Sequence, residues 1–229
     1  CDRDGRMIAQ AKTIALHLGA VPEAMSVVLE RYADTLVEGD AIILNDPYQG
    51  GMHLPDIFMF MPVFYDGQLQ AFTVVICHHT DVGGRVPGSN ASDSTEIFQE
   101  GLRIPALKLF EGGQPNTTLI CIVEANVRLP DRVLGDLKAQ YAACRTGGLE
   151  LEKVFRRYGP IGAQRYFSEL LDYAEHMTRE EISTWPDGTY TFEDYIDDDG
   201  LSDTPLPIRV SVAVHGDSIT VDYKGSSSQ

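Results

Sequence analysis

The sequence predicts an α+β protein, with antiparallel strands toward each end of the chain and helices between them. Three observations predict this class. Residues 57–77 hold two apolar runs joined by Tyr65-Asp66-Gly67, a typical hairpin turn. Residues 131–182 carry apolar side chains at helical spacing. Residues 208–223 again hold two strand-like runs, joined by a tight Gly216-Asp217 turn.

The composition is that of a globular protein with enough apolar side chains for a core. The 229 residues are 43% hydrophobic and 23% charged. No run approaches the roughly 18 apolar residues that a membrane helix needs, and the start lacks a signal-peptide pattern. The formal net charge is −16, from 34 acidic and 18 basic residues. Such a field repels phosphate backbones, so we expect no nucleic-acid partner and no membrane partner.

The four cysteines are Cys1, Cys77, Cys121 and Cys144, and none forms a C-x-x-C pair. This usage is typical of reduced, mostly buried thiols, so we expect a cytoplasmic protein. Cys77 is next to two histidines, but the apolar residues 72–76 before it favour an inert core thiol over a reactive one.

The first half of the chain divides into short elements. Residues 6–18 are ambiguous between strand and helix, and Pro22 predicts the first position of a helix that runs to about Leu36. Ala41–Leu44, Ile57–Phe64 and Leu69–Cys77 are the predicted strands. The apolar face of the predicted helix holds Met25, Val28, Leu29, Tyr32 and Leu36.

Residues 82–94 are predicted to form a loop. A short helix follows, and the sequence Asp93-Ser94-Thr95-Glu96 is predicted to be the capping box at its start. From Pro130 the pattern becomes helical, with one helix over 131–158 that is interrupted at Gly147-Gly148 and a second helix over about 163–182. Strands over 189–195, 208–215 and 218–223 follow. We therefore expect a metal and active-site region over 1–129, and a helical pair followed by antiparallel strands over 130–229.

Chemistry-bearing residues concentrate in two strings, Asn45–Asp56 and Cys77–Gly84. Together they hold three of the six histidines and three carboxylates, threaded with glycine and proline. Imidazole and carboxylate suit a divalent metal, and glycine lets the backbone turn tightly around it. These side chains are His53, His78, His79, Asp46, Asp56 and Asp81.

The spacing narrows the choice of metal ligands. Pro55 disfavours a helix, but a loop after Gly50-Gly51 can point both His53 and Asp56 at one ion. Successive strand side chains face opposite ways, so one of the next two histidines joins them, and His78 is the expected ligand. His79 and Asp81 would then contact substrate or orient the ligands. The alternative is that these histidines satisfy hydrogen bonds in a polar loop, and spacing alone leaves both open.

Other chemistry is excluded by missing motifs. The chain has no G-x-x-x-x-G-K-[ST] phosphate loop and no G-x-S-x-G nucleophile turn. The run Asp197–Gly200 fails the calcium-loop formula and is read as a solvated acidic turn. Glu96 is explained by capping, whereas Glu100 has no such role and could reach the site. We treat the isolated His17, His176 and His215 as structural or surface residues.

The stretch from Gly39 to Pro105 resembles the B-type subunit of the hydantoinase, oxoprolinase and ketone carboxylase family. The likeness is carried by long ungapped strings over 39–47, 50–56, 78–84 and 94–105. A weaker likeness extends through Gly135-Asp136-Leu137-Lys138-Ala139-Gln140, Asp198–Gly200 and Gly225–Ser227. Family chains extend beyond both ends of this one, and the chain opens at Cys1 without methionine. We therefore expect a fragment of a larger, multi-layer subunit.

The resemblance implies an enzyme that couples ATP hydrolysis to attack on an unreactive carbonyl. ATP-Mg is held by a companion A-type subunit, and members open hydantoins or 5-oxoproline, or carboxylate ketones such as acetone and acetophenone. In the ketone carboxylases the B-type subunit holds a divalent metal through a His-Leu-Pro-Asp string and a later histidine. Those positions correspond to His53, Asp56 and His78, and the metal would be Mn, Zn or Fe.

We therefore expect the metal-bearing B-type subunit of an ATP-dependent cyclic amidohydrolase, working in a hetero-oligomer with its A-type partner. The substrate would be a hydantoin or a 5-oxoproline-like lactam whose carbonyl the partner phosphorylates. Asp46, His79 and Glu100 are the candidates for general acid/base work, with Asp81 beside them. The alternatives are ketone carboxylation, and a scaffold subunit whose metal is structural.

Overall fold

The computed structural model describes residues 1–12, 17 and 19–228. They form two compact units, one of residues 1–91 and 95–167 and one of residues 92–94 and 168–229. The border falls inside a long helix, later in the chain than Pro130, where the sequence changes character. Residues 7–11 have no regular structure, and part of the segment predicted as strand or helix, residues 13–16 and 18, lies outside the described residues.

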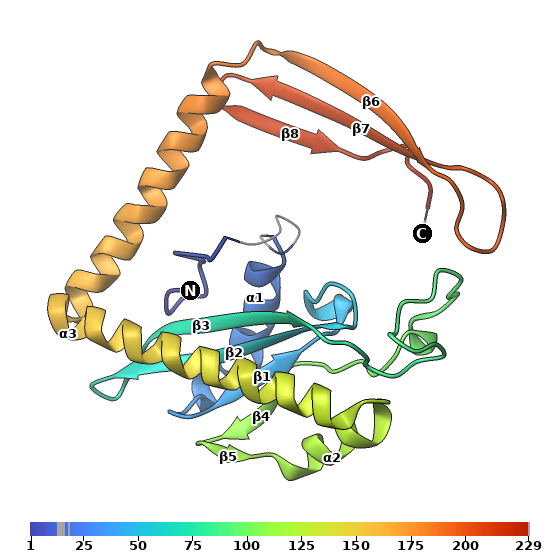
Figure 1. The fold of residues 1–229 in the computed structure, drawn as a ribbon. Coiled ribbons are helices and arrows are strands. Elements are labelled where there is room, and N and C mark those ends of the chain that lie inside the picture. The colour runs from blue at the N-terminus through green and yellow to red at the C-terminus, as the bar shows by residue number, and fades with distance from the viewer. Residues whose placement is uncertain (13–16, 18, 229) are drawn as a thin grey trace. The chain divides into compact units, whose positions relative to one another are not determined.

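The first unit is built on a five-stranded antiparallel sheet with strand order β3-β2-β1-β4-β5 (Figure 1). The predicted α+β class is therefore confirmed, and so are the first three predicted strands. The two further strands, β4 and β5, were not predicted. The bounds are β1 Ala41–Leu44, β2 Asp56–Tyr65, β3 Gln68–His78, β4 Leu107–Glu111 and β5 Gln114–Pro115.

The β2–β3 hairpin turns at Asp66 and Gly67, whose φ angles are 51° and 73°. Positive φ at both central positions is the geometry that matches the right-handed twist of the flanking strands. Strand β2 is buried on both faces, because Phe58 and Phe60 pack into one core cluster and Met59 into another. This explains why the strand is a continuous apolar run without the usual alternation.

One face of the sheet is covered by helix α1, Ala20–Tyr32, which continues as a 3-10 turn, η2, Ala33–Thr35. The predicted helix is confirmed, although it begins two residues before Pro22. Its buried side chains pack with Phe58, Phe60 and Phe72 of the sheet. They are Val21, Ala24, Met25 and Val28.

The opposite face is covered by helix α2, Thr117–Asn126, and by the first half of helix α3, Pro130–Ser183 (Figure 1). Helix α2 was not predicted; the side chain of Asn116 caps it by accepting a hydrogen bond from Leu119 N at 3.1 Å. Helix α3 presents Val133, Leu137 and Cys144 to the sheet.

The predicted interruption of α3 at Gly147-Gly148 is wrong. Both residues are helical. The one break is at Gly159, which has φ 69° and ψ 156° and precedes Pro160, so it lies between the two helices predicted over 131–158 and 163–182. At Gly147 a Cβ atom would lie 2.9 Å from Cγ2 of Thr73 on β3. Glycine therefore allows the helix to approach the sheet closely here. Glycine lowers the stability of a helix, and the packing that it permits offsets this loss.

The capping box predicted at Asp93–Glu96 is also wrong. Only a single 3-10 turn forms, η4, Ile97–Gln99, and Glu96 makes no side-chain cap hydrogen bond. Oε1 of Gln99 accepts a hydrogen bond from Thr95 N at 2.8 Å instead. A side chain from inside the turn thus takes the place of the expected cap. A second 3-10 turn, η3, Pro47–Gln49, follows strand β1.

The second unit contains an antiparallel sheet of order β6-β7-β8, with bounds Gly188–Ile196, Leu206–His215 and Ser218–Asp222. These three strands confirm the prediction for the end of the chain. Asp199 accepts hydrogen bonds from Leu201 N and Ser202 N, so residues 197–200 begin an acidic turn, as expected. No helix among the described residues is long and apolar enough to cross a membrane.

The close approach of α3 to β3 makes a testable prediction. Gly147→Ala should lower the free energy of unfolding by about 1–3 kcal/mol, because the new methyl group collides with Thr73. Gly135→Ala is the matched control: it lies in the same helix with no atom within 4 Å of its added Cβ, and should raise stability by up to about 1 kcal/mol. Urea unfolding of both variants measures this; equal stabilisation would contradict the packing described.

Candidate metal centre

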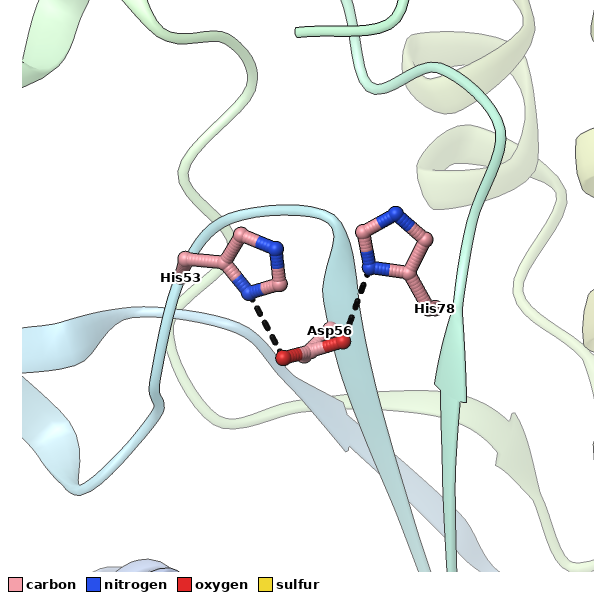
Figure 2. Close-up of side chains that lie close together, drawn as sticks. All are labelled: His53, Asp56 and His78. Atoms are coloured by element: carbon pink, nitrogen blue, oxygen red, sulfur yellow. Dashed lines mark hydrogen bonds and ion pairs between the residues drawn. The ribbon is translucent and has the colours of Figure 1, made fainter. Parts of the chain in front are cut away.

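The candidate centre lies at the end of the sheet where β2 begins and β3 ends. Asp56 is the first residue of β2 and His78 the last of β3, and the strand register places them directly opposite each other. His53 is in the turn just before β2, where its carbonyl accepts a hydrogen bond from Asp56 N at 2.9 Å. Hairpin pairing and a tight turn thus bring His53, Asp56 and His78 together, as Figure 2 shows.

The Asp56 carboxylate bridges the two imidazoles. Its Oδ2 lies 2.6 Å from Nδ1 of His53, and its Oδ1 lies 3.1 Å from Nδ1 of His78 (Figure 2). The two rings are stacked, with centroids 5.0 Å apart and planes 26° apart. The Asp56 side chain is 4% exposed, whereas those of His53 and His78 are 43% and 53% exposed. The cluster is therefore anchored in the protein and open to solvent on its imidazole side.

This donor set fits a divalent transition metal. One ligand atom from each of the three residues lies within 4.8 Å of the others. Two imidazoles with one carboxylate suit Mn, Zn or Fe better than Ca or Mg, which prefer oxygen ligands. Three protein ligands also leave coordination positions for substrate or water, as in catalytic sites.

Asn45 fixes the loop that carries His53. Its side-chain amide donates to Leu54 O at 2.7 Å and to Leu102 O at 2.9 Å, and its Oδ1 accepts from Ile104 N at 2.6 Å. At Gly51 a Cβ atom would lie 2.7 Å from the carbonyl of Asn45, so only glycine lets the loop fold back this closely. Gly51 and Asn45 thus hold the loop that carries His53, although neither belongs to the three-residue cluster.

His79 faces away from the cluster, as strand alternation predicts. Its ring is fully buried, with Nε2 2.9 Å from Oε1 of Gln140, and its backbone N–H donates to Pro55 O at 2.8 Å. Burial lowers the pKa of His79 below its ordinary value, although the hydrogen bond with Gln140 opposes this shift. The ring is therefore held in the protein interior, where burial disfavours its charged form, and its candidate role as a general acid/base stays a prediction.

Asp46 and Glu100 lie in different settings. Asp46 is buried; its Oδ1 accepts from Tyr48 N at 3.0 Å, and its Oδ2 lies 3.6 Å from Nε of Arg103. The carboxylate of Glu100 is half-buried and makes no hydrogen bond or ion pair with any described residue. Neither belongs to the three-residue cluster.

Asp81 organises the loop after β3. Its two carboxylate oxygens accept hydrogen bonds from the backbone of Gly83, Gly88 and Arg128 and from the Arg128 guanidinium, at 2.9–3.2 Å. Burial alone would raise the pKa of Asp81, but these bonds together hold the pKa below its ordinary value. The carboxylate is thus fully used by loop contacts, and it is not part of the cluster.

Comparison with known proteins decides the family. Residues 1–229 match the hydantoinase B/oxoprolinase family over their whole length. The chain belongs to this family. The sequence resemblance is therefore confirmed, and the sheet that carries the cluster lies within the matched residues.

Two relatives illustrate the family. The putative D-/L-hydantoinase B subunit of Pseudomonas sp. strain NS671 is 36% identical over 99% of this chain and 40% of that protein. The beta subunit of the caprolactamase of Pseudomonas jessenii is 39% identical over 94% of this chain and 37% of that protein. The chain thus spans about two fifths of the length of these family members.

A solved family structure and a more distant relative complete the comparison. The crystal structure of the ATP-dependent caprolactamase from Pseudomonas jessenii superimposes with a TM-score of 0.91 at 38% identity, over 96% of this chain and 38% of that chain. The acetophenone carboxylase delta subunit of Aromatoleum aromaticum is 31% identical over 84% of this chain and 29% of that protein.

The sequence alone assigned no role to Gln140 or Arg128. In the structure Gln140 contacts the chain beside the three-residue cluster, and Arg128 contacts the loop after β3. Gln140 shares the sheet-facing stripe of α3 with Val133, Leu137 and Cys144, and all four are buried. An amide on an otherwise apolar helical stripe was the available signal, because a buried polar group needs a partner. Arg128 gave no comparable signal.

The Asp81 contacts make the second prediction. Asp81→Asn should lower the free energy of unfolding by about 1–3 kcal/mol at pH 7, because it removes the charge of a buried carboxylate that accepts hydrogen bonds from three backbone N–H groups and from the partly exposed Arg128 guanidinium. The folded-state pKa of Asp81 is depressed, so this stability is present above the ordinary pKa of about 4 and is lost as pH falls through the folded value.

Urea unfolding at pH 7 and near pH 3.5 tests the Asp81 prediction. The stability gap between the wild type and Asp81→Asn should shrink at the lower pH. The exposed Asp4→Asn is the control and should show no pH-dependent gap. A gap for Asp81→Asn that stays constant with pH would show that its charge is not what stabilises the loop.

Proposed function

We propose that this chain is the metal-bearing part of the B-type subunit of an ATP-dependent enzyme that opens cyclic amides. The single observation that carries the proposal is the buried Asp56 carboxylate bridging two exposed imidazoles. The substrate class is a hydantoin or a 5-oxoproline-like lactam. It is supported by the names of two relatives more than 35% identical, the B subunit of a hydantoinase and the beta subunit of a caprolactamase.

In this proposal His53, Asp56 and His78 hold the divalent metal, and the exposed edge of the rings admits the substrate. A bound divalent metal supplies Lewis acidity that polarises a carbonyl oxygen. Asp56 is buried and fixes the separation of the two imidazoles. Glu100 is the best remaining candidate for proton transfer, because its carboxylate has no partner among the described residues.

The other two acid/base candidates have more constrained settings. Asp46 forms an ion pair with Arg103 and accepts a hydrogen bond from Tyr48 N, so protonation of Asp46 would weaken both contacts. His79 is buried and hydrogen-bonded to Gln140, a setting that suits orientation of its neighbour His78.

ATP enters the proposal through a partner. The sequence has no phosphate-binding loop, and the relatives are named as the B, beta and delta subunits of larger enzymes. We propose that ATP-Mg is held by an A-type subunit, which phosphorylates the amide carbonyl within a hetero-oligomer. Phosphorylation makes an unreactive amide carbonyl susceptible to attack by water.

Ketone carboxylation is a second candidate, because the acetophenone carboxylase delta subunit is 31% identical over 84% of the chain. In that reaction the same three residues would hold a metal that stabilises the enolate of a ketone, and the enolate would attack an activated carboxylate. In a scaffold role, by contrast, protein groups would close the coordination shell and turnover would not depend on the metal.

The metal assignment predicts a change in metal content. His53→Ala and Asp56→Ala should each lower the bound divalent metal of the purified full-length subunit by at least about tenfold, because each removes one of three ligands. His215→Ala is the control, since that side chain is 95% exposed and lies outside the cluster. Elemental analysis after dialysis measures the content; unchanged metal in both ligand variants would refute the assignment.

The partner assignment predicts where ATP turnover occurs. The isolated B-type subunit should bind no ATP by calorimetry, and the complex with its A-type partner should hydrolyse ATP when given its substrate. A panel of lactams, hydantoins and ketones then separates the two candidate reactions. Turnover with cyclic amides only supports the proposed function, turnover with ketones only supports the second, and micromolar ATP binding by the isolated subunit contradicts the partner assignment.

A further inference from the structure

We propose that Gln140 is a positioning residue for the metal centre, acting through a clamp formed by Gln140, His79, Ile57 and Val75, here called the Gln140 clamp. This inference rests on the proposed function and adds to it a residue from helix α3. Gln140 touches none of the three ligands. It contacts the residues next to them.

The hydrogen bonds of Gln140 join both strands that carry ligands. Its Nε2 donates to Ile57 O at 2.8 Å and to Val75 O at 3.4 Å, and its Oε1 lies 2.9 Å from Nε2 of His79. Ile57 directly follows the ligand Asp56, and His79 directly follows the ligand His78. One side chain therefore fixes the chain beside two of the three ligands.

The direction of these bonds settles the form of the His79 ring. Because the Gln140 amide group donates to two carbonyls, its oxygen faces His79, whose Nε2 must then carry the hydrogen. Nδ1 of His79 is buried and has no hydrogen-bond partner among the described residues. Gln140 thus provides the only side-chain hydrogen bond that orients this fully buried ring within the described part of the chain.

The His79 backbone closes the clamp on its other side. Its N–H donates to Pro55 O at 2.8 Å, so the pairing of β3 with the chain of β2 continues past the strand end. Asp56 is in this way held between Pro55, which His79 fixes, and Ile57, which Gln140 fixes. The Asp56 side chain is also held by burial, whereas the side chains of His53 and His78 are about half exposed and depend more on where their backbone is held.

The clamp should therefore act on metal affinity. Groups that orient metal ligands typically change affinity by about 10- to 100-fold when removed. A purely structural role of Gln140 predicts something else: lower stability, with the affinity of the folded protein unchanged. The two roles differ in a measurable quantity.

The test uses the full-length subunit, with Mn²⁺ as the probe, and an isosteric variant, Gln140→Met, that lacks all three hydrogen bonds. Thr73→Val is the matched control, because Thr73 Oγ1 donates to Cys144 O at 3.1 Å and so joins the same helix to the same strand away from the centre. Mn²⁺ titration followed by electron paramagnetic resonance should give a Kd raised about 10- to 100-fold in Gln140→Met and by less than about twofold in Thr73→Val. Equal Kd values for the two variants would overturn the clamp.

A second measurement is made without metal. Hydrogen exchange of the His79 amide should be faster in metal-free Gln140→Met than in metal-free Thr73→Val, because the bond to Pro55 O loses its support; equal rates would overturn the clamp. If the wild type binds no Mn²⁺, the metal centre of the proposed function fails, and the exchange rates alone decide the clamp. If Gln140→Met does not fold, Gln140→Glu replaces it. The new glutamate side chain would keep an acceptor for His79 but lose the donor to Ile57 O, so the His79 amide should exchange faster, and the Kd for Mn²⁺ should be higher, than in Thr73→Val. Values equal to those of Thr73→Val would overturn the clamp.

Discussion

The bridge from the Asp56 carboxylate to two imidazoles is the interaction around which this end of the sheet is arranged. A buried carboxylate is costly unless it is paired, and here both oxygens face an imidazole nitrogen at 2.6 and 3.1 Å. The carboxylate is buried because it begins a strand that is covered on both faces. The imidazoles are exposed because one lies in a turn and the other at a strand end. Burial of the carboxylate and exposure of the two imidazoles produce a cluster that is both anchored and accessible.

The remainder of the first unit supplies the rigidity that this arrangement requires. Helix α1 packs on one face of β2 and helix α3 on the other, so the strand that carries Asp56 has little freedom to move. Asn45 ties the His53 loop to the chain before β4 through three hydrogen bonds to backbone groups. Asp81 and Arg128 do the same for the loop that follows His79. Polar side chains with satisfied partners thus hold each loop that borders the centre.

Much of this fold was predictable from the sequence, and the failures have physical causes. Strands β1, β2 and β3 are apolar runs bounded by glycine, proline or a hairpin turn, so neighbouring residues determine where each strand begins and ends. Helix α2 was missed because its run of leucine, isoleucine and valine after Asn116 resembles a strand, and the cap and the packing of Leu119 and Val123 decide for a helix. Gly147 was misread because a glycine that breaks a helix and one that admits a neighbouring strand look the same in sequence.

The sequence likewise predicted part of the candidate site and missed another part. Alternation and spacing, supported by the family string, selected the three residues that the structure brings together. Gln140 was not found, because its partners His79 and Ile57 lie 61 and 83 residues away in the chain and only the packing of α3 on the sheet brings them into contact. The surroundings of a site depend on such long-range contacts more than its ligands do.

The most direct test of the central claim is anomalous diffraction from crystals of the full-length subunit soaked with Mn²⁺. We expect one strong anomalous peak among His53, Asp56 and His78, at coordination distances of about 2.0–2.3 Å from all three side chains. A peak bound instead by His79, or no peak at this end of the sheet in crystals that bind Mn²⁺ elsewhere, would contradict it.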